Sequence, residues 1–283
     1  YGYGSWRYKN YYGLGLKKSN QLKVALDELE QIEPVTENQK KAFDAWEEGH
    51  NIVLSGSAGT GKTFIALYLA FSKMLKYEQY NKLLIVRSMV STRDGGHLPG
   101  TKEEKEEPYK APYKSICGEL FGYDGAWGKL TTTKSVGFET TSFIRGVTFD
   151  RTILIVDEMQ NMNFHELDSI ITRIGNDCKI IFCGDHNQTD FTRKDEKDGI
   201  IKFISLIEQM RFFRVINFGW IDIVRSDFVR DYIMTKEMMG FWGEEEKKNQ
   251  ENMLKWGWSN LWKKDKRQMI RWHECGYGNV LKN

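Results

Sequence analysis

The chain contains five short, mostly apolar runs, each of which is typical of a buried β-strand. Every run is four or five residues long and rich in Ile, Leu, Val or Phe. Runs that do not alternate apolar with polar positions favour strands covered on both faces, as in a parallel sheet. The predicted strands are 51–55, 83–86, 153–156, 180–183 and 215–218.

Helical patterns lie before, between and after these runs. They predict helices over 20–32, 36–46, 64–70, 163–174 and 198–210. The second of these opens on Thr36-Glu37-Asn38-Gln39, the pattern of a capping box. Strands that alternate with helices predict an α/β fold in which a parallel sheet carries helices on both faces.

One long segment, 91–149, departs from this alternation. It holds three of the four prolines, Pro99, Pro108 and Pro112, together with the charged run 102–107. A connection of this length inside a compact domain is usually functional or partly structured. We expect the same of this segment.

Charge is distributed unevenly over the 283 residues, whose net charge is +2. Residues 1–26 carry five basic groups and no acid, and 241–283 carry nine basic against six acidic groups, which leaves −6 for 27–240. A core of that sign excludes nucleic-acid binding over its whole surface, so RNA or single-stranded DNA would need a local basic patch or the ends. We expect a disordered leader over 1–26, one domain over 27–240, and a Trp- and Lys-rich tail over 241–283 with no predicted role.

The four cysteines, Cys117, Cys178, Cys183 and Cys275, show no C-x-x-C spacing, so we expect free thiols rather than a metal or disulfide site. No apolar stretch approaches the roughly 20 residues that span a bilayer. The N-terminus also lacks the apolar segment of a secretory signal. These features predict a cytoplasmic protein with no membrane partner.

A complete phosphate-loop motif, G-x-x-x-x-G-K-[ST], follows the first predicted strand and precedes a helix. Lys62 would reach the outer phosphates of a nucleotide, and the Thr63 hydroxyl would ligate magnesium. Gln39, upstream, has two candidate roles: the third position of the capping box, or an amide that reads adenine. The predicted ATP-binding residues are Gln39 and Gly56, Ser57, Ala58, Gly59, Thr60, Gly61, Lys62 and Thr63.

Two acids end the strand at 153–156 and supply candidates for hydrolysis. Asp157 would hold Mg²⁺ through a water, and Glu158 would accept the proton of the attacking water. Gln188 follows the next strand, where it would sense the terminal phosphate. Arg173 and Arg225 are candidates for an arginine finger, supplied within the chain or by a neighbouring subunit.

Taken together, these motifs resemble the PhoH family, most of all its compact phage versions, over roughly residues 33–235. The resemblance implies a RecA-like P-loop NTPase core related to superfamily 1 helicases. It further implies ATP and Mg²⁺ as ligands, ring-shaped homo-oligomers such as hexamers, and a role in RNA or other nucleic-acid metabolism. The motifs are 56–63, Leu98-Pro99-Gly100-Thr101, Glu104-Lys105, Pro108-Tyr109, 145–149, Asp157-Glu158-Met159-Gln160-Asn161, 172–175, 184–188 and Asp222-Ile223-Val224-Arg225.

The chain departs from the family pattern at two positions. Met159 stands where alanine is usual, a change that the neighbouring metal acid should tolerate. Ser226 replaces the histidine that commonly follows the arginine of the last motif, which bears on the role given to Arg225. No PIN-type nuclease domain or RNA-binding module is recognisable, so a nucleic-acid role rests on the resemblance.

Two other functions are compatible with these residues. Thymidine-kinase-like enzymes also pair a phosphate loop with an Asp-Glu-x-Gln sequence, but they usually carry a cysteine-rich zinc ribbon, which this sequence lacks. A non-catalytic nucleotide switch or assembly scaffold is the second alternative. A two-lobed helicase would need a second RecA-like lobe, and the stretch after Thr235 is too short for one, so neighbouring subunits would have to complete the site.

Overall fold

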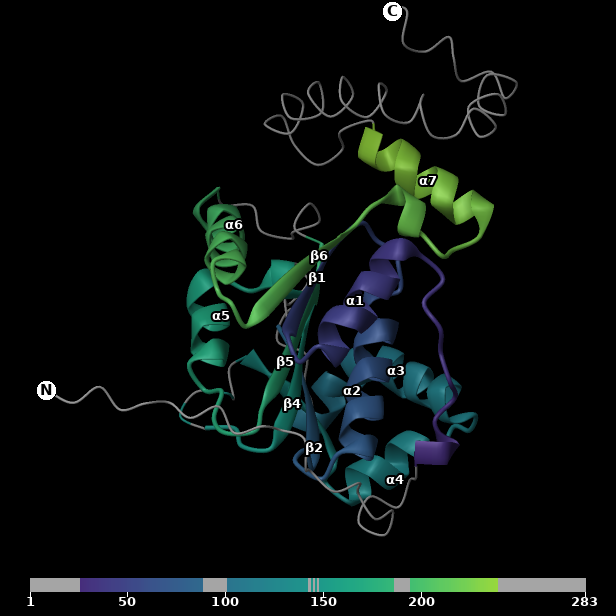
Figure 1. The fold of residues 1–283 in the computed structure, drawn as a ribbon, viewed down its shortest axis with the longest axis vertical. Helices are drawn as coiled ribbons and strands as arrows, with labels where there is room; N and C mark the ends of the chain where they lie inside the picture. The colour runs from purple at the N-terminus through teal and green to yellow at the C-terminus, as the bar shows by residue number, and fades with distance from the viewer. Residues whose placement is uncertain are drawn as a thin grey trace, which may run out of the picture. The chain divides into compact units, whose positions relative to one another are not determined.

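A six-stranded, all-parallel sheet forms the centre of the fold (Figure 1). The computed structural model describes residues 26–88, 101–141, 144, 146, 148–185 and 194–238. All five predicted strands are confirmed, each extended at one or both ends. The strands are β1 (Asn51–Gly56), β2 (Lys82–Arg87), β3 (Val136–Thr140), β4 (Thr152–Asp157), β5 (Lys179–Gly184) and β6 (Phe213–Phe218).

The strand order is β3-β2-β4-β5-β1-β6. One strand, β5, therefore separates β1, which carries the phosphate loop, from β4, which carries the acid pair. Because every pairing is parallel, the carboxyl ends of these strands meet at one edge of the sheet, which is where open α/β sheets bind ligands. The predicted α/β fold with a parallel sheet is confirmed.

Helices cover both faces of the sheet, as predicted. One face carries α1 to α4 and packs on the strand residues Ile52, Ile85, Ile155 and Ile181, while α5 and α6 pack on Val53, Val86, Val156 and Phe182. Figure 1 shows these two layers on opposite sides of the strands. The helices of the sheet domain are α1 (Glu37–Glu47), α2 (Lys62–Lys76), α3 (Lys102–Phe121), α4 (Ala126–Thr132), α5 (Phe164–Ile171) and α6 (Lys194–Glu208).

The proline-rich segment 91–149 is partly structured, as expected, and supplies α3, α4 and the edge strand β3. Helix α3 begins with a capping box: the Thr101 hydroxyl accepts from the Glu104 N–H at 3.3 Å, and the Glu104 carboxylate accepts from the Thr101 N–H at 2.8 Å. Pro108 and Pro112 lie inside this helix. Burial of Tyr113, Cys117 and Leu120 against the sheet domain outweighs the hydrogen bonds that the prolines remove.

The helix predicted over 20–32 is wrong in its described part. Only Leu26–Glu28 form a short 3₁₀ turn, and the chain then continues without helix as far as Thr36. Leu29 is buried in the core, and the Glu30 N–H donates to the Leu120 carbonyl at 2.8 Å. These tertiary contacts replace the local ones that a helix would have made, and Pro34 disfavours a helical residue before it.

The chain divides into two compact units between Arg225 and Ser226. The described part of the second unit is α7 (Asp227–Met238), a helix without buried residues. The predicted leader 1–26, apart from Leu26, and the predicted tail 241–283 lie outside the described residues, as does Cys275.

Within the part of the chain that the structure describes, Cys117, Cys178 and Cys183 are free thiols. No cluster of three or more potential metal ligands of the His, Cys, Asp or Glu type occurs there. Among the described helices, none combines the length and the hydropathy that crossing a membrane requires.

Candidate active site

The phosphate loop joins the end of β1 to the start of α2. Its glycines Gly56, Gly59 and Gly61 have φ angles of +126°, +75° and +81°, a region that favours glycine. At Gly56 a Cβ atom would lie 2.0 Å from the Phe218 carbonyl oxygen. The loop therefore needs glycine both for its curvature and for its close approach to the end of β6, and it presents the N-terminus of a 15-residue helix to an anion.

Lys62 folds back onto the loop itself. Its Nζ donates to the carbonyl oxygens of Gly56 and Ser57, each at 2.7 Å, and lies 3.3 Å from the Thr60 hydroxyl. Burial lowers the pKa of Lys62, and the negative groups around it, Asp185 foremost, oppose that shift. The ammonium group is thus held at the loop by acceptors that a phosphate oxygen can replace.

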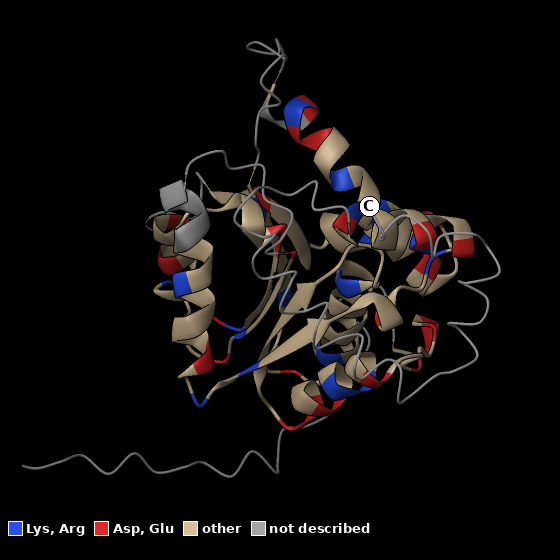
Figure 2. Cartoon of the chain, turned by 90° about the horizontal axis from the view of Figure 1, so that it is seen from above, with Lys and Arg blue, Asp and Glu red and all other residues tan. Residues whose placement is uncertain are grey.

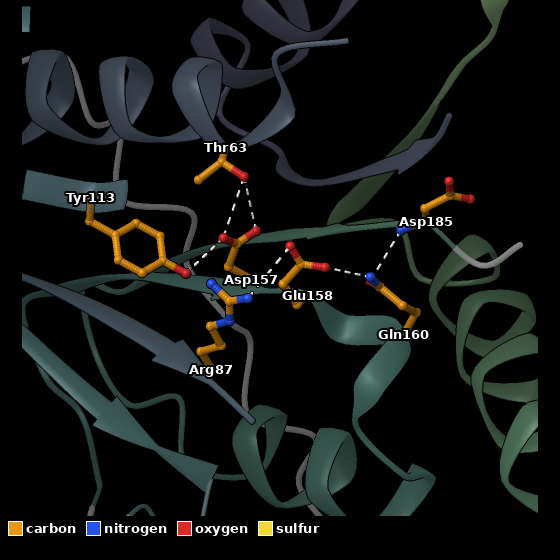
Figure 3. Close-up of polar contacts among 7 residues, drawn as sticks. All are labelled: Thr63, Arg87, Tyr113, Asp157, Glu158, Gln160 and Asp185. Carbon is orange, nitrogen blue, oxygen red and sulfur yellow. Dashed lines mark hydrogen bonds and ion pairs between the residues drawn. The ribbon is translucent and has the colours of Figure 1, made fainter. Parts of the chain in front are cut away.

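The side chains of Thr63 and Asp157 contact each other at the carboxyl ends of the strands (Figure 3). The Thr63 hydroxyl donates to the Asp157 carboxylate, with distances of 3.1 Å to Oδ1 and 3.3 Å to Oδ2. Asp157 is only 4% exposed. Burial and the neighbouring charge of Glu158 raise the pKa of Asp157, while hydrogen bonds from Tyr113 and Thr63 and the Arg87 charge oppose the rise.

This pair of donors fits a magnesium ion. A hydroxyl and a carboxylate are hard oxygen ligands, and Mg²⁺ typically takes one or two protein ligands while keeping waters and substrate phosphates. Thr63 and Asp157 are therefore the residues that would hold the ion.

Glu158 follows Asp157 in the left-handed region, with φ +53° and ψ +43°. This turn directs its carboxylate away from Asp157, toward the Gln160 amide nitrogen, which donates to it. The other carboxylate oxygen lies 3.9 Å from the Arg87 guanidinium. The side chain is 37% exposed, so water can reach it, as a general base requires.

Four further residues join the site that the sequence prediction did not assign to it. Arg87 ends β2 beside the acids, the Tyr113 hydroxyl donates to Asp157 at 2.7 Å, and the side-chain carbonyl of Gln160 accepts from the Asp185 N–H at 3.1 Å. Arg87 could have been found from its position at a strand end, the rule that identified the acid pair. Gln160 and Asp185 stand within recognised motifs without an assigned role, and no local pattern indicates Tyr113.

Gln39 lies directly behind the phosphate loop. Its N–H donates to the Thr36 hydroxyl at 3.3 Å, so Thr36 is the N-cap of α1 and Gln39 its third position, but the return bond of a capping box, from the Thr36 N–H to the Gln39 side chain, does not form. Its side chain, however, accepts from the Val35 N–H at 2.9 Å and donates to the Thr60 carbonyl at 3.3 Å. The amide is therefore in contact with the loop, and adenine recognition by Gln39 stays a prediction.

The two candidate arginines lie at opposite ends of the parallel strands, Arg225 near the carboxyl ends and Arg173 near the amino ends. Arg225 is exposed and directly follows Val224, whose N–H donates to the Gly59 carbonyl of the phosphate loop at 3.0 Å. Arg173 precedes β5, and its carbonyl accepts from the Phe149 N–H at 2.9 Å before β4 begins. Arg173 thus lies at the amino ends of the strands and cannot serve the phosphate loop of its own chain, because that loop lies at their carboxyl ends. Its use by a neighbouring subunit stays a prediction.

The structure brings most of the predicted site together. Ser57 and Thr60 are buried in the loop, and Lys62, Thr63, Asp157 and Glu158 surround one position at the carboxyl edge of the sheet. Ala58 and Gly59 lie in the same loop. Gln188 lies outside the described residues, so its predicted role as a phosphate sensor stays a prediction. The arrangement can bind a polyphosphate, hold a divalent ion and activate water.

Two curated proteins are similar to this chain in sequence. The PhoH-like protein of Mycobacterium leprae is 27% identical over 203 residues, covering 71% of this chain and 57% of the relative. Protein PhoH2 of Bacillus subtilis is 33% identical over 158 residues, covering 54% of this chain and 36% of the relative. The chain thus spans about one third to three fifths of the length of the curated relatives it matches.

A solved structure of the Pif1 helicase from Candida albicans is similar at 15% identity with a TM-score of 0.35, covering 70% of this chain and 43% of that one. The family model described as PhoH-like protein matches residues 31–237. Because this match covers well over half of the sequence and includes every described element of the site, the chain belongs to the PhoH-like protein family.

Proposed function

We propose that this chain binds ATP with Mg²⁺ and hydrolyses it. The observation that carries the proposal is the contact between the Thr63 hydroxyl and the Asp157 carboxylate, because it joins the phosphate loop to the acid strand. A phosphate loop alone indicates phosphate binding. A loop threonine in contact with a buried strand-end acid adds the site for the ion that nucleotide hydrolysis uses.

Each residue has a defined role in this proposal. Main-chain N–H groups of the loop and Lys62 bind the β- and γ-phosphates. Thr63 and Asp157 hold Mg²⁺, which, when bound, neutralises charge on the phosphates. Glu158 accepts the proton of the attacking water, Gln188 senses the terminal phosphate, and Arg225 stabilises charge in the transition state, within its own chain or in a neighbour.

We further propose that hydrolysis is coupled to the remodelling of RNA or single-stranded DNA in a ring-shaped homo-oligomer. The resemblance to a family with suspected nucleic-acid roles supports the coupling, as do the basic ends of the sequence. On the described elements, basic and acidic residues are interspersed (Figure 2). On α3, for example, Lys110 pairs with Glu106 at 2.7 Å and Lys114 pairs with Glu107. These lysines of α3 are therefore paired with acids of the same helix.

The test is ATP turnover measured with and without single-stranded RNA and DNA at two salt concentrations. Contact with the phosphate backbone predicts stimulation that weakens as salt rises. Glu158→Gln should keep ATP binding and abolish turnover, since the amide cannot accept the proton of water. If turnover is unchanged in Glu158→Gln, Glu158 has no part in the mechanism.

The same experiment separates the alternatives. A nucleoside-type kinase would consume ATP only when an acceptor is added, so a panel of nucleosides is included beside the nucleic acids. A nucleotide-dependent scaffold would bind ATP without turnover under any of these conditions. Turnover without an acceptor, lost in Glu158→Gln, supports the ATPase and contradicts both alternatives.

A further inference from the structure

A buried tyrosine on α3 contacts the acid that the metal proposal depends on. The Tyr113 side chain is fully buried, and its hydroxyl donates to Asp157 Oδ2 at 2.7 Å (Figure 3). Its ring packs on Phe138 of β3, with the ring centroids 5.9 Å apart. Since the Thr63 hydroxyl contacts the same carboxylate, Asp157 is held from the phosphate loop on one side and from α3 on the other.

The carboxylate fixes the direction of this hydrogen bond. A carboxylate only accepts, so the Tyr113 hydroxyl gives its proton to Asp157. Arg87, the last residue of β2, is paired in register with Asp157 on the neighbouring strand, and its positive charge lies near the Tyr113 hydroxyl.

Arg87 also contacts α3 at Tyr109, one turn before Tyr113. Its guanidinium lies 5.6 Å from the centroid of the Tyr109 ring and 3.9 Å from the Glu158 carboxylate. Both acids of the pair are therefore connected to α3, one through Tyr113 and the other through Arg87.

We propose that Tyr113 is a positioning residue that holds Asp157 for the divalent ion and thereby couples helix α3 to the nucleotide site. This inference rests on the proposed function, because it concerns the ion that Asp157 would hold. Residues that hydrogen-bond a metal ligand fix its orientation, and their loss typically weakens metal binding by about 10- to 100-fold. Tyr113 is in that position with respect to Asp157, and it lies on an element outside the phosphate-loop and acid motifs.

The test compares Tyr113→Phe with the unaltered chain. The change removes only the hydroxyl and keeps the ring in its place against Phe138. Binding of a non-hydrolysable ATP analogue is measured by calorimetry in EDTA and then across a Mg²⁺ titration. We expect unchanged analogue affinity in EDTA and an apparent Mg²⁺ affinity at least about 10-fold weaker.

Tyr123→Phe is the matched control. The Tyr123 hydroxyl also faces a carboxylate, that of Glu28 at 3.4 Å, but neither residue belongs to the site. This variant should bind Mg²⁺ and the analogue as the unaltered chain does. A similar weakening in both variants would indicate general loss of stability and would overturn the inference.

Hydrogen exchange gives a readout of the coupling itself. In the unaltered chain and in Tyr123→Phe, the analogue with Mg²⁺ should slow the exchange of the α3 backbone amides, and in Tyr113→Phe that protection should be lost. Phe138→Leu loosens the packing of the Tyr113 ring and should weaken Mg²⁺ binding in the same direction, which provides a second variant if Tyr113→Phe does not fold. Mg²⁺ affinity within about twofold of the parent in folded Tyr113→Phe overturns the inference while leaving the proposed function intact. If the unaltered chain shows no Mg²⁺-dependent binding of the analogue, the proposed function fails first.

Discussion

The Thr63 hydroxyl lies 3.1 Å from Asp157 Oδ1, although the two residues are 94 positions apart in the chain. Thr63 ends the phosphate-loop motif and is the second residue of helix α2, and Asp157 ends strand β4. Their contact depends on β5, because this strand lies between β1 and β4 and so sets the distance between the carboxyl ends of those two strands. The site is therefore a product of strand order as much as of its two motifs.

The contact predicts the effect of Asp157→Asn. The amide keeps the size of the carboxylate but loses its charge, so it can no longer favour a divalent ion over water. In EDTA, we expect the affinity of Asp157→Asn for the ATP analogue to stay within about threefold of the parent. Adding Mg²⁺ should no longer raise that affinity, so in Mg²⁺ the variant should bind the analogue about 10-fold or more weakly than the parent. Calorimetry with and without Mg²⁺ measures both quantities. A variant that retains the full Mg²⁺ effect would show that Asp157 is not a ligand.

Arg225 and Arg173 should differ sharply when replaced by alanine. Arg225 adjoins the phosphate loop through the Val224 contact, so Arg225→Ala should lower kcat by about 10³-fold while analogue binding is retained. Arg173 lies at the other edge of the sheet, so Arg173→Ala should lower kcat only in assembled oligomers, where a neighbour could use it. Turnover measured above and below the concentration of assembly separates these cases. Near-normal turnover in Arg225→Ala would remove that residue from the mechanism.

Gly56 should tolerate no side chain. In Gly56→Ala the new Cβ would meet the Phe218 carbonyl oxygen at 2.0 Å, and the residue would keep a φ of +126°. Displacement of the loop from β6 should lower the free energy of unfolding by at least about 3 kcal/mol and abolish nucleotide binding. Urea denaturation measures the first effect. Gly128→Ala in α4 is the control, since no atom lies within 4 Å of its added Cβ, and it should be neutral or stabilising by up to about 1 kcal/mol.

Lys179 should make stability depend on pH. Its Nζ is buried at the end of α1, where it donates to the Trp46 carbonyl at 3.0 Å, and burial lowers its pKa from 10.5 to about 7. Between about pH 7 and pH 10 the unfolded chain binds more protons at this residue than the folded chain, so its contribution to stability improves as pH rises. Below pH 7 the ammonium is buried in its charged form and the penalty is complete.

Lys179→Met removes that titration. We expect the variant to gain stability relative to the parent at pH 6 and the gain to shrink at pH 9.5, as measured by urea denaturation at both values. Lys40→Met, at an exposed lysine of α1, is the control and should show a pH-independent difference. An equal difference at the two pH values for Lys179→Met would mean that Lys179 keeps its proton in the folded protein.

Much of the fold and the centre of the site follow from local sequence. A phosphate loop depends on glycines at fixed spacing, and Gly56, Gly59 and Gly61 take the positive φ angles that this spacing predicts. Fully buried parallel strands produce continuous apolar runs, so the end of such a run is enough to place Asp157 and Glu158 at a strand end. These features are determined over a few consecutive residues, which is why the sequence by itself specifies them.

Other features depend on contacts between distant segments, which are seen only in the folded chain. Proline makes α3 look improbable locally, yet burial stabilises it and brings Tyr113 to Asp157. The sequence motifs give Arg173 and Arg225 the same candidate role. Only the folded sheet shows that they lie at opposite ends of its strands. The helix predicted over 20–32 does not form in its described part, because burial of Leu29 in the core and the hydrogen bond from Glu30 to the Leu120 carbonyl stabilise the chain more than a local helical turn would. Local patterns carry no information on strand order, and strand order decides which side chains meet.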